Sequence, residues 1–407
     1  MSVIRAQRLV TAREASFFLA LLLAIVALAS IALPHSATAQ EFTVTRLNEA
    51  EPIISQSDFR RAAAGKSDGR NINGPSVIRI PDWIPPEKRA APGARFYLYF
   101  AHHKGAYIRL AWAEEVQGPW HLYNVAADIP QGRRGVLDIG DDRELAFGNS
   151  LSITRHVASP DVHIDNEHKR IVMYFHGGID YAGDPLPYQY SMVATSPWGL
   201  DFSAGIEPVL LSNSYLRVFD YNGSLHGLIS TQLLQPPDQD APWSPAASRS
   251  PAKGVWNESR AAMLDFSKTT LANGEQFAPG RTIVRHMGLY LSGSDLTIFF
   301  TMKEHAPERI LAIKLDLKNG CWYCAIPNKV PTEVMRPQEP WEGSELTPSP
   351  SKNGASKKLE NALRDPYIFE DQGILYLFYA GGGERGIGLA RLDPIPNGHA
   401  LKGVLTN

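Results

Sequence analysis

Short apolar runs and turn-forming residues alternate along most of the chain. From about residue 70 onward, runs of Val, Ile, Leu, Phe and Tyr are separated by clusters of Gly, Pro, Asn and Asp. Runs of this kind indicate β-strands, because helices need longer stretches with a period of about 3.6 residues. The 33 glycines and 30 prolines also fit a protein with many turns. We therefore predict an all-β fold.

The predicted strands recur in five similar units. Each unit has an opening strand, a tight turn, an apolar and aromatic strand, and a third strand with small residues. The opening strands are expected at residues 73–78, 159–164, 216–219, 287–291 and 364–369. One such sheet cannot bury both of its faces, whereas five sheets packed radially can. The pattern predicts a single five-bladed β-propeller, with the opening strands lining a central funnel.

The order of these units divides the chain into four segments. Residues 1–39 are predicted as a signal peptide, 40–70 as an N-terminal segment, 71–395 as the propeller and 396–407 as a tail. Within the second segment, residues 42–47 are expected to form an outer strand that closes the ring. Insertions fall at about 125–150, 235–280 and 340–362, and the last two have the composition of surface loops.

The first segment sets the expected compartment. Three arginines precede an apolar run over residues 17–33, and Pro34 and an A-x-A sequence ending at Ala39 follow. This order is typical of a secretory signal peptide cleaved after Ala39. The alternative is an uncleaved membrane anchor, because the run approaches the length that spans a bilayer. We expect an exported protein, periplasmic or extracellular, with no membrane contact after cleavage.

Composition and charge fit a globular protein without a nucleic-acid partner. Hydrophobic residues make up 44% of the chain and charged residues 20%, and the formal net charge is −2. Nucleic acids and anionic membranes require clustered Lys and Arg, which the sequence lacks. The two cysteines, Cys321 and Cys324, form a C-x-x-C pair. In an exported chain we interpret them as a local disulfide; a redox site or a zinc site are the alternatives.

Sequence motifs in the fifth unit resemble a known enzyme family. The run 364–369, which reads Arg-Asp-Pro-Tyr-Ile-Phe, and the later Tyr379-Ala380-Gly381-Gly382 resemble a blade of the propeller glycosidases of glycoside hydrolase family 43. A longer pattern over 73–76, 100–105, 158–163 and 306–310 resembles an uncharacterised bacterial subgroup. The resemblance spans about residues 70–395 and implies an exported glycoside hydrolase-like protein acting on poly- or oligosaccharide. The family places three carboxylates in the funnel, as a base, a helper and an acid.

The sequence departs from that family at the expected catalytic positions. The family's base is an Asp before Pro in the first blade, where this chain has Gly74 before Pro75. In the second blade Ser159 stands before Pro, and an acid follows at Asp161. Catalytic residues therefore do not transfer one for one. The alternative function is a non-catalytic propeller that binds carbohydrate or another partner.

Three carboxylates are candidate catalytic residues. Asp161 is the candidate base; its alternative role is to accept backbone N–H groups at a strand start. Asp365 is a second candidate, and its Asp-Pro sequence also suits a turn. Glu342, next to Trp341 in the loop before the fifth unit, is a candidate general acid; Glu258 in the insertion after the third unit and a histidine are the alternatives. Glu308 and Arg309 are expected to form an exposed ion pair of little consequence.

Eight further polar residues are candidates for substrate binding, because aligning the units places them near the funnel. They are Asn73, His102, His103, His163, His176, Arg217, His286 and Arg364. Any single loop histidine is equally explained by solvation. We expect no cofactor; the alternative is a calcium or other cation held near His286 through water, although hard cations prefer oxygen ligands.

Overall fold

Most of the described chain is β-strand, because its apolar runs are short and rich in β-branched and aromatic residues. The computed structural model describes residues 42–61, 69–123, 133–147, 150–229, 232–235, 257–258, 284–318, 330–352 and 354–395. The helical elements in these ranges are α2 (Gln56–Arg61) and the 3-10 turns η1 (Asn48–Ala50), η2 (Pro86–Lys88), η3 (Ser203–Gly205) and η5 (Pro340–Glu342). The predicted all-β fold is confirmed.

Several predictions concern residues outside these ranges. The signal peptide, the tail 396–407, Cys321 and Cys324 all lie outside the described residues, so cleavage, export and the disulfide stay predictions. The boundary between segments 40–70 and 71–395 also stays a prediction. Throughout the described ranges, no helix has both the length and the apolar character needed to cross a membrane.

The strands form five antiparallel sheets, each built mainly from consecutive strands. The first contains β3 (Asn73–Arg79), β4 (Phe96–Ala101), β5 (Tyr107–Ala113), β6 (His121–Leu122) and β7 (Leu137–Asp138). The second contains β8 (Glu144–Ala146), β9 (Leu151–Asp165), β10 (Arg170–Tyr181), β11 (Asp184–Ser196) and β12 (Ser212–Asn213). The third contains β13 (Arg217–Tyr221), β14 (Ser224–Ile229), β15 (Gln232–Gln235) and β16 (Asn257–Glu258). The fourth contains β17 (Val284–Ser292), β18 (Asp295–Met302), β19 (Ile310–Asp316) and β20 (Thr332–Met335). The fifth contains β21 (Leu363–Asp371), β22 (Ile374–Gly381), β23 (Gly386–Pro394), β1 (Phe42–Arg46) and β2 (Ile54–Ser55).

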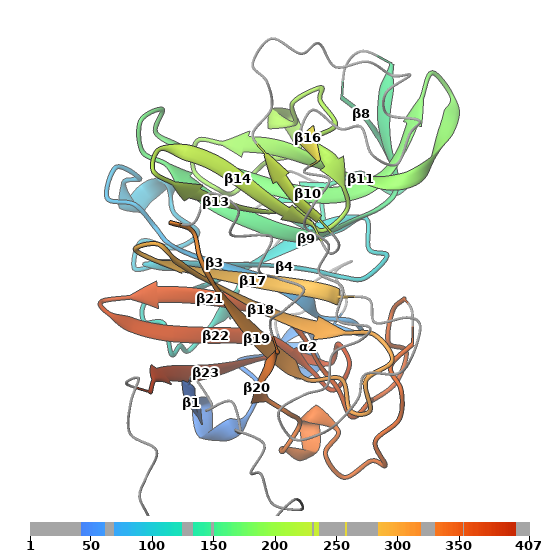
Figure 1. Ribbon diagram of the computed structural model, residues 1–407. Helices are drawn as coiled ribbons and strands as arrows, with labels where there is room; N and C mark the ends of the chain where they lie inside the picture. The colour runs from blue at the N-terminus through green and yellow to red at the C-terminus, as the bar shows by residue number, and fades with distance from the viewer. Residues whose placement is uncertain are drawn as a thin grey trace, which may run out of the picture. The chain divides into compact units, whose positions relative to one another are not determined.

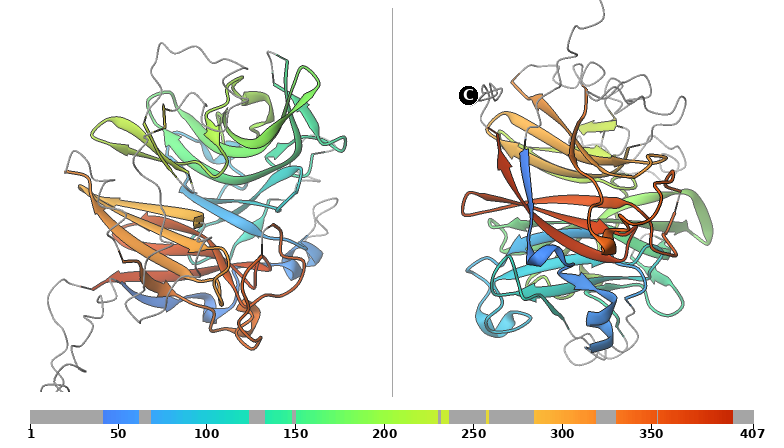
Figure 2. Two further views of the ribbon diagram at one scale, coloured as in Figure 1. Left: turned by 45° about the vertical axis from the view of Figure 1, so that its right-hand side comes forward. Right: turned by 90° about the horizontal axis from the view of Figure 1, so that it is seen from below.

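The first long strand of each sheet packs against those of its two neighbours. These inner strands follow one another as β3, β9, β13, β17 and β21, and β21 packs against β3 again. Figure 1 labels them, and the left view of Figure 2 shows the sheets fanned around a common axis. The fold is the predicted five-bladed β-propeller. The outermost strand of the fifth blade is β1, which pairs with β23 and so joins early and late parts of the chain in one sheet.

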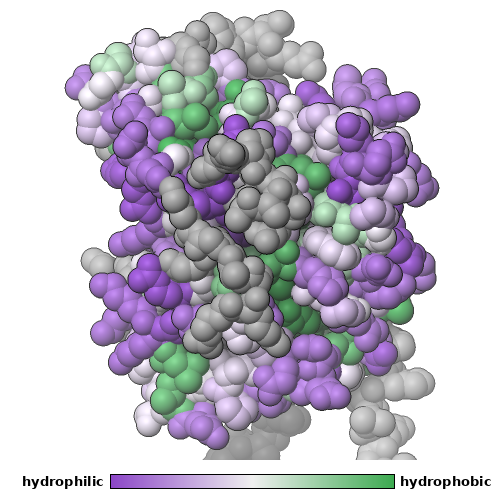
Figure 3. Space-filling view, turned by 180° about the vertical axis from the view of Figure 1, so that it is seen from behind, coloured by the Kyte–Doolittle hydropathy of each residue, from purple (hydrophilic) through white to green (hydrophobic). Residues whose placement is uncertain are grey.

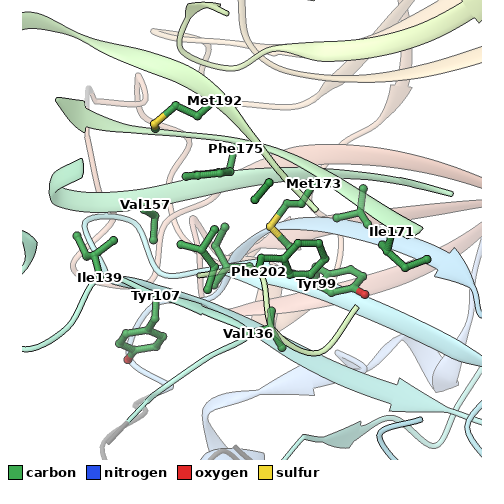
Figure 4. Close-up of a cluster of buried hydrophobic side chains, with 14 of the residues drawn as sticks. Tyr99, Tyr107, Val136, Ile139, Val157, Ile171, Met173, Phe175, Met192 and Phe202 are labelled. Carbon is green, nitrogen blue, oxygen red and sulfur yellow. The ribbon is translucent and has the colours of Figure 1, made fainter. Parts of the chain in front are cut away.

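Apolar side chains fill the space between neighbouring blades. Every residue of β4 is buried, because both faces of its sheet meet other parts of the core. Tyr99 packs edge-on against Phe202 with ring centroids 5.9 Å apart, and Met173 and Phe175 belong to the same cluster (Figure 4). The outer face drawn in Figure 3 is mostly hydrophilic. Packing of sheet on sheet therefore supplies the core.

The second blade extends further than the others. Its strands β9, β10 and β11 have 15, 12 and 13 residues, so β9 begins well before the predicted start at Ser159. The β9–β10 pairing shifts register between Tyr174 and His176 and again between Gly177 and Gly178. Bulges of this kind bend a strand and re-aim its side chains. The extension thereby brings residues of this blade to the opening of the funnel.

One residue of each inner strand ties its blade to the next one. We call these residues the waist ring: Ser76, Asp161, Arg217, Gly288 and Tyr367. The backbone N–H of Val162 donates to Ser76 Oγ at 2.9 Å, and that of Val218 donates to Asp161 Oδ2 at 2.9 Å. Each bond connects the inner strands of two consecutive blades.

The other three members of the waist ring complete the circuit. Arg217 Nε donates to the Met287 carbonyl at 2.9 Å, Tyr367 Oη donates to the Val77 carbonyl at 3.2 Å, and a Cβ at Gly288 would lie 2.5 Å from the Pro366 carbonyl oxygen. The position of Gly288 is therefore fixed by close backbone approach, which only glycine permits. The waist ring fastens all five blades to one another.

Candidate functional site

A pocket of about 410 Å³ opens above the waist ring, at the mouth of the funnel. Its lining residues are Asn73, His103, Lys104, Arg143, Arg155, His156, Ala158, Ser159, His176, Tyr188, Gln189, Tyr215 and His286. They come from the first four blades, and the extension of the second blade supplies a large share. Its volume falls in the usual range of ligand pockets, about 300–1,000 Å³.

The five residues two positions before the waist ring form a second ring around the axis. We call them the mouth ring: Gly74, Ser159, Tyr215, His286 and Asp365. Four of them have positive φ angles, of 62°, 53°, 69° and 51° for Gly74, Ser159, Tyr215 and Asp365. Positive φ is uncommon for residues other than glycine and often occurs at functional sites. Ser159, Tyr215 and His286 line the pocket.

The imidazole of His286 contacts the carboxylate of Asp365. His286 Nδ1 and Asp365 Oδ1 are 2.8 Å apart, and both side chains are 1% exposed. Burial would raise the pKa of Asp365, but the charges of His286 and Arg285 and the hydrogen bond from His286 outweigh burial and lower that pKa to about 2. Burial also lowers the pKa of His286, although Asp365 opposes this shift. An ionised Asp365 thus holds a neutral imidazole, whose Nε2 remains available to a ligand.

A buried ionic network supports this pair. Glu308 Oε2 accepts hydrogen bonds from Arg285 Nη1 and Arg364 Nε, both at 2.9 Å, and Glu308 Oε1 accepts one from Thr301 at 3.0 Å. Glu308 has no exposed surface. The expected exposed pair of Glu308 with Arg309 is therefore wrong, because Glu308 points inward between two arginines, whereas Arg309 contacts Glu333 at 3.1 Å. Burial opposes ionisation of Glu308, yet Arg364 and Arg285 lower its pKa.

A second buried carboxylate connects this network to the pocket wall. Glu384 Oε1 lies 3.0 Å from His103 Nδ1 and accepts a hydrogen bond from Arg364 Nη1 at 3.2 Å. Glu384 Oε2 accepts hydrogen bonds from the Asn71 side chain and from the Ser356 backbone N–H. Both carboxylate oxygens are thus committed to protein groups, and Glu384 fixes the orientation of His103.

Aromatic rings contact one another at tilted or edge-on angles along one wall of the pocket. The ring centroids of Tyr215 and His176 are 4.5 Å apart, those of Tyr215 and His286 5.1 Å, and those of His156 and His176 5.8 Å. Burial, followed by the charge of Asp365, raises the pKa of Tyr215 to about 12, so its hydroxyl stays protonated. Burial and the positive charges around them lower the pKa of His156 to about 4 and that of His176 well below its usual value. At neutral pH these histidines are uncharged hydrogen-bonding groups.

Two buried polar atoms in the wall lack partners. Asn73 is 5% exposed and His176 is 2% exposed, and both line the pocket. Within the described residues, neither Asn73 Oδ1 nor His176 Nδ1 has a hydrogen-bond partner. Leaving a buried polar atom unpaired costs about 1–3 kcal/mol. Such atoms are suited to bind the polar groups of a ligand.

Four of the predicted binding residues meet in the pocket. Asn73, His103, His176 and His286 all line it. Asp365 and Arg364 are fully buried behind the wall: Asp365 contacts His286, and Arg364 pairs with Glu308, Glu384 and Glu360. Neither Asp365 nor Arg364 can touch a ligand without a rearrangement of His286 and its surroundings.

The other predicted residues lie elsewhere. Asp161 is in the waist ring, where it accepts a hydrogen bond from the Val218 N–H and contacts His163 Nε2 at 3.0 Å. This is the alternative role given for Asp161 above, the acceptor of a backbone N–H group. Arg217 is also in the waist ring, since its guanidinium donates to the carbonyls of Ser159 and Met287. Neither Asp161, His163 nor Arg217 belongs to the pocket lining.

Glu342 and His102 are also outside the pocket. Glu342 is fully buried in the fifth blade, where it accepts hydrogen bonds from Arg46 Nε at 2.9 Å and Tyr379 Oη at 2.7 Å. His102 turns toward its own loop, with Nδ1 3.1 Å from the His103 carbonyl oxygen. Glu342 therefore holds β1 and β22 together, whereas the general acid was expected to reach over the funnel.

Sequence reasoning missed much of the pocket wall. The missed lining residues with polar side chains are Lys104, Arg143, Arg155, His156, Ser159, Tyr188, Gln189 and Tyr215. Most lie on the extension of the second blade. Leu151 and Ile153 are buried and alternate with polar residues, which is the one sequence signal that this strand starts early.

The described residues contain no group of three His, Cys, Asp or Glu side chains arranged to hold a metal ion. The ring nitrogen of His286 that faces away from the pocket is engaged by Asp365. A cation near His286 stays an untested prediction.

Comparisons with solved structures return propellers of low similarity. A GH43_1 enzyme from Xanthomonas citri is 14% identical, with a TM-score of 0.45, over 91% of this chain and 95% of that one. A glycoside hydrolase described as putative from Parabacteroides distasonis is 12% identical, with a TM-score of 0.46, over 88% and 98%. An α-L-arabinanase of Cellvibrio cellulosa complexed with arabinohexaose is 10% identical, with a TM-score of 0.42, over 81% and 94%. At these values no activity is transferred to this chain, and the fold is established by its own sheets.

Comparison of sequences gives a nearer relative. No protein-family model matches the chain. A viral protein, "Uncharacterized protein R118" of Acanthamoeba polyphaga mimivirus, is 30% identical over 329 residues, which cover 79% of this chain and 83% of the viral protein. This relative does not confirm the expected bacterial subgroup, which stays a prediction. The identity and coverage show that the chain belongs to the same protein family as the mimivirus protein R118.

Proposed function

We propose that this protein is a carbohydrate-active propeller that binds poly- or oligosaccharide in the pocket of the mouth ring. The observation that carries the proposal is the pair of unpartnered buried atoms, Asn73 Oδ1 and His176 Nδ1, in the pocket wall. Sugar hydroxyls donate and accept hydrogen bonds, so they match both an amide oxygen and an imidazole nitrogen. The exposed ring of Tyr188 and the ring of Tyr215 offer apolar faces for a pyranose.

The pocket chemistry supports sugar binding better than hydrolysis by paired carboxylates. Glycosidic hydrolysis of the usual kind uses two carboxyl groups, roughly 5–10 Å apart, that flank the scissile bond. None of the described lining residues is Asp or Glu. Asp161 and Glu342, the predicted base and acid, each serve a structural contact in a different part of the molecule. Asp365 does not line the pocket, so any effect that it has on a bound sugar passes through His286, which contacts it and lines the pocket.

The test is calorimetric titration of the purified protein with neutral and acidic oligosaccharides. We expect saturable binding of at least one sugar, and His176→Phe should weaken it by about fivefold, because one hydrogen bond contributes about 1 kcal/mol. Phe keeps the ring that packs on Tyr215 and removes both nitrogens. Binding of no sugar in the panel by a folded protein would contradict the proposal.

A matched control separates the pocket from general effects of the substitution. His226 is stacked on Phe219 with ring centroids 5.3 Å apart and lies outside the pocket. His226→Phe therefore makes the same chemical change on a stacked histidine without touching the proposed site. The proposal expects sugar affinity to survive in His226→Phe and to fall in His176→Phe.

A further inference from the structure

The pocket has a cationic rim. Lys104, Arg143 and Arg155 are all exposed, and Arg143 donates a hydrogen bond to the Lys104 carbonyl, which holds the two loops together. Arg155 has a φ of 71° and stands beside Gly178, where a Cβ would lie 2.6 Å from Arg155 Nε. The second blade thus places the guanidinium of Arg155 at the rim, with a positive φ at Arg155 and with glycine at position 178 leaving room for the side chain. No acidic side chain of the described chain lines the pocket to neutralise these charges.

A cationic rim selects both the ligand and the reaction. Hydrolysis of a glycosidic bond passes through an oxocarbenium-like transition state, whose positive charge the three cations of the rim would destabilise. Abstraction of a proton from a carbon next to a carboxylate develops negative charge, which the same cations stabilise. An acidic sugar offers such a carbon. The positive charge of the rim therefore favours a reaction whose transition state gains negative charge over one whose transition state gains positive charge.

The groups needed for that chemistry stand together in the wall. His286 is a neutral imidazole oriented by Asp365 at 2.8 Å, with Nε2 left for a proton. Tyr215 lies beside it, with ring centroids 5.1 Å apart, and carries a protonated hydroxyl. Asn73 and Arg155 line the same pocket and can bind a carboxylate. General acid and base catalysis by groups so placed contributes about 10²–10⁴-fold in rate.

We propose that the pocket cleaves the glycosidic linkage of a uronic acid-containing glycan by β-elimination, with His286 as base and Tyr215 as acid. This inference rests on the proposed sugar-binding function and goes beyond it. His286 Nε2 takes the proton from the carbon next to the carboxylate, and the released electron pair forms a double bond to the neighbouring ring carbon. The bond from that carbon to the glycosidic oxygen breaks, and the leaving oxygen takes the proton of the Tyr215 hydroxyl. Proton exchange with solvent restores both side chains, and no co-reactant is consumed.

The experiment follows turnover of polygalacturonate, alginate and a glycosaminoglycan, each beside its carboxyl-reduced neutral form. Elimination creates a double bond conjugated to a carboxylate, which absorbs in the ultraviolet, whereas hydrolysis creates reducing ends without this absorbance. We expect absorbance to rise with at least one acidic glycan and with none of the reduced forms. His286→Gln and Tyr215→Phe should each slow it by about 10²-fold or more.

Two measurements guard against misfolded variants. Thermal unfolding checks each variant, and Arg155→Gln, at an exposed position, should raise KM for the acidic glycan. The matched control is Arg95→Gln, an exposed arginine that pairs with Glu115 away from the pocket and should leave turnover unchanged. Equal KM values for the two variants would overturn the role of the rim.

The outcomes separate this inference from the function on which it rests. Reducing ends without ultraviolet absorbance, or saturable binding of an acidic glycan without any cleavage, would overturn β-elimination and leave sugar binding intact. Preference for the carboxyl-reduced form would overturn the acidic substrate class. Absence of binding to every glycan would overturn both.

Discussion

The mouth ring and the waist ring lie two residues apart along the inner strand of each blade or, at Tyr215, just before that strand, yet their side chains have different roles. Members of the waist ring meet the backbone of the next blade: Val162 donates to Ser76, Val218 donates to Asp161, and Arg217 donates to Met287. Three members of the mouth ring line the pocket, and a fourth, Asp365, orients one of them. In four of the inner strands a register shift falls between or next to the two rings.

This difference explains how one strand position can be structural while a near neighbour is functional. Side chains of a regular strand alternate between faces, so residues two apart would point the same way. The bulges break this alternation, and the backbone has positive φ angles at Ser159 and Tyr215, which line the pocket. The polar residues at the mouth are then free to serve a ligand because the waist ring already connects the blades.

The largest effect should come from the network that supports the mouth ring. Glu308 is fully buried between Arg285 and Arg364, so Glu308→Gln leaves two buried guanidinium groups without their shared counter-charge. We expect a loss of about 3–5 kcal/mol in the free energy of unfolding, measured by chemical denaturation. Glu333→Gln, which affects the partly exposed pair with Arg309, is the control and should cost far less. Equal losses would mean that burial of Glu308 does not matter.

Within the mouth ring, Asp365→Asn should lower kcat on an acidic glycan by roughly 10²-fold with little change in KM, because Asp365 does not line the pocket and acts through its neighbours His286 and Tyr215. Asn tolerates the φ of 51° at this position. His286 also faces Arg285, Glu308, Tyr215 and His176. Burial lowers the pKa of His286, and the charge of Asp365 is the largest influence that raises it. Removing its charge should therefore lower that pKa further and move the acidic limb of the kcat/KM profile to lower pH.

Asp371→Asn is the matched control for this variant. Asp371 lies at the other end of the same strand, β21, and pairs with Arg79 at 2.6 Å near the surface. We expect neither kcat nor the pH profile to change. A pH profile that stays in place in Asp365→Asn would assign Asp365 a structural role alone.

In the waist ring, Asp161→Ala should affect stability and leave sugar binding unchanged. The substitution removes the acceptor of the Val218 N–H and the partner of His163, at a cost of about 1–3 kcal/mol in the free energy of unfolding. Urea denaturation and calorimetric titration measure the two properties on one preparation. Loss of turnover with unchanged affinity and stability would instead restore Asp161 as a catalytic base and erase the distinction between the two rings.

The sequence predicts the propeller because the signals for strands, turns and repeated blades all lie in short stretches of the chain. Short apolar runs, turn residues and their fivefold recurrence specify strands and blades without knowledge of distant contacts. The funnel histidines at 176 and 286 also follow from aligning these repeats. Glu342 could not be placed this way, since its partners Arg46 and Tyr379 lie 296 and 37 residues away. Nor does any local signal indicate that Glu308 points inward, because its burial depends on Arg285 and Arg364 from other strands.

The last prediction concerns pH and the histidines beside the mouth ring. The pKa of His156 is lowered from 6.5 to about 4, so His156 becomes protonated at a lower pH in the folded protein than in the unfolded chain. The unfolded state then holds more protons between these values, and the free energy of unfolding falls as pH falls from about 6.5 to about 4. Each such histidine contributes up to about 1.4 kcal/mol per pH unit. Asp365, with a pKa lowered from 3.8 to about 2, loses its contribution only below that window.

Denaturation curves measured at several pH values between 6.5 and 4 check this prediction. His156→Gln should flatten the dependence, because Gln takes up no proton in either state, and His168→Gln, at an exposed turn of the same blade, is the matched control. An acidic oligosaccharide should oppose the effect, since a bound anion favours the protonated histidine and so raises its pKa. A neutral sugar bound with similar affinity should not. Equal slopes for the two variants would show that His156 titrates alike in both states, and the pocket wall would then be wetter than its burial indicates.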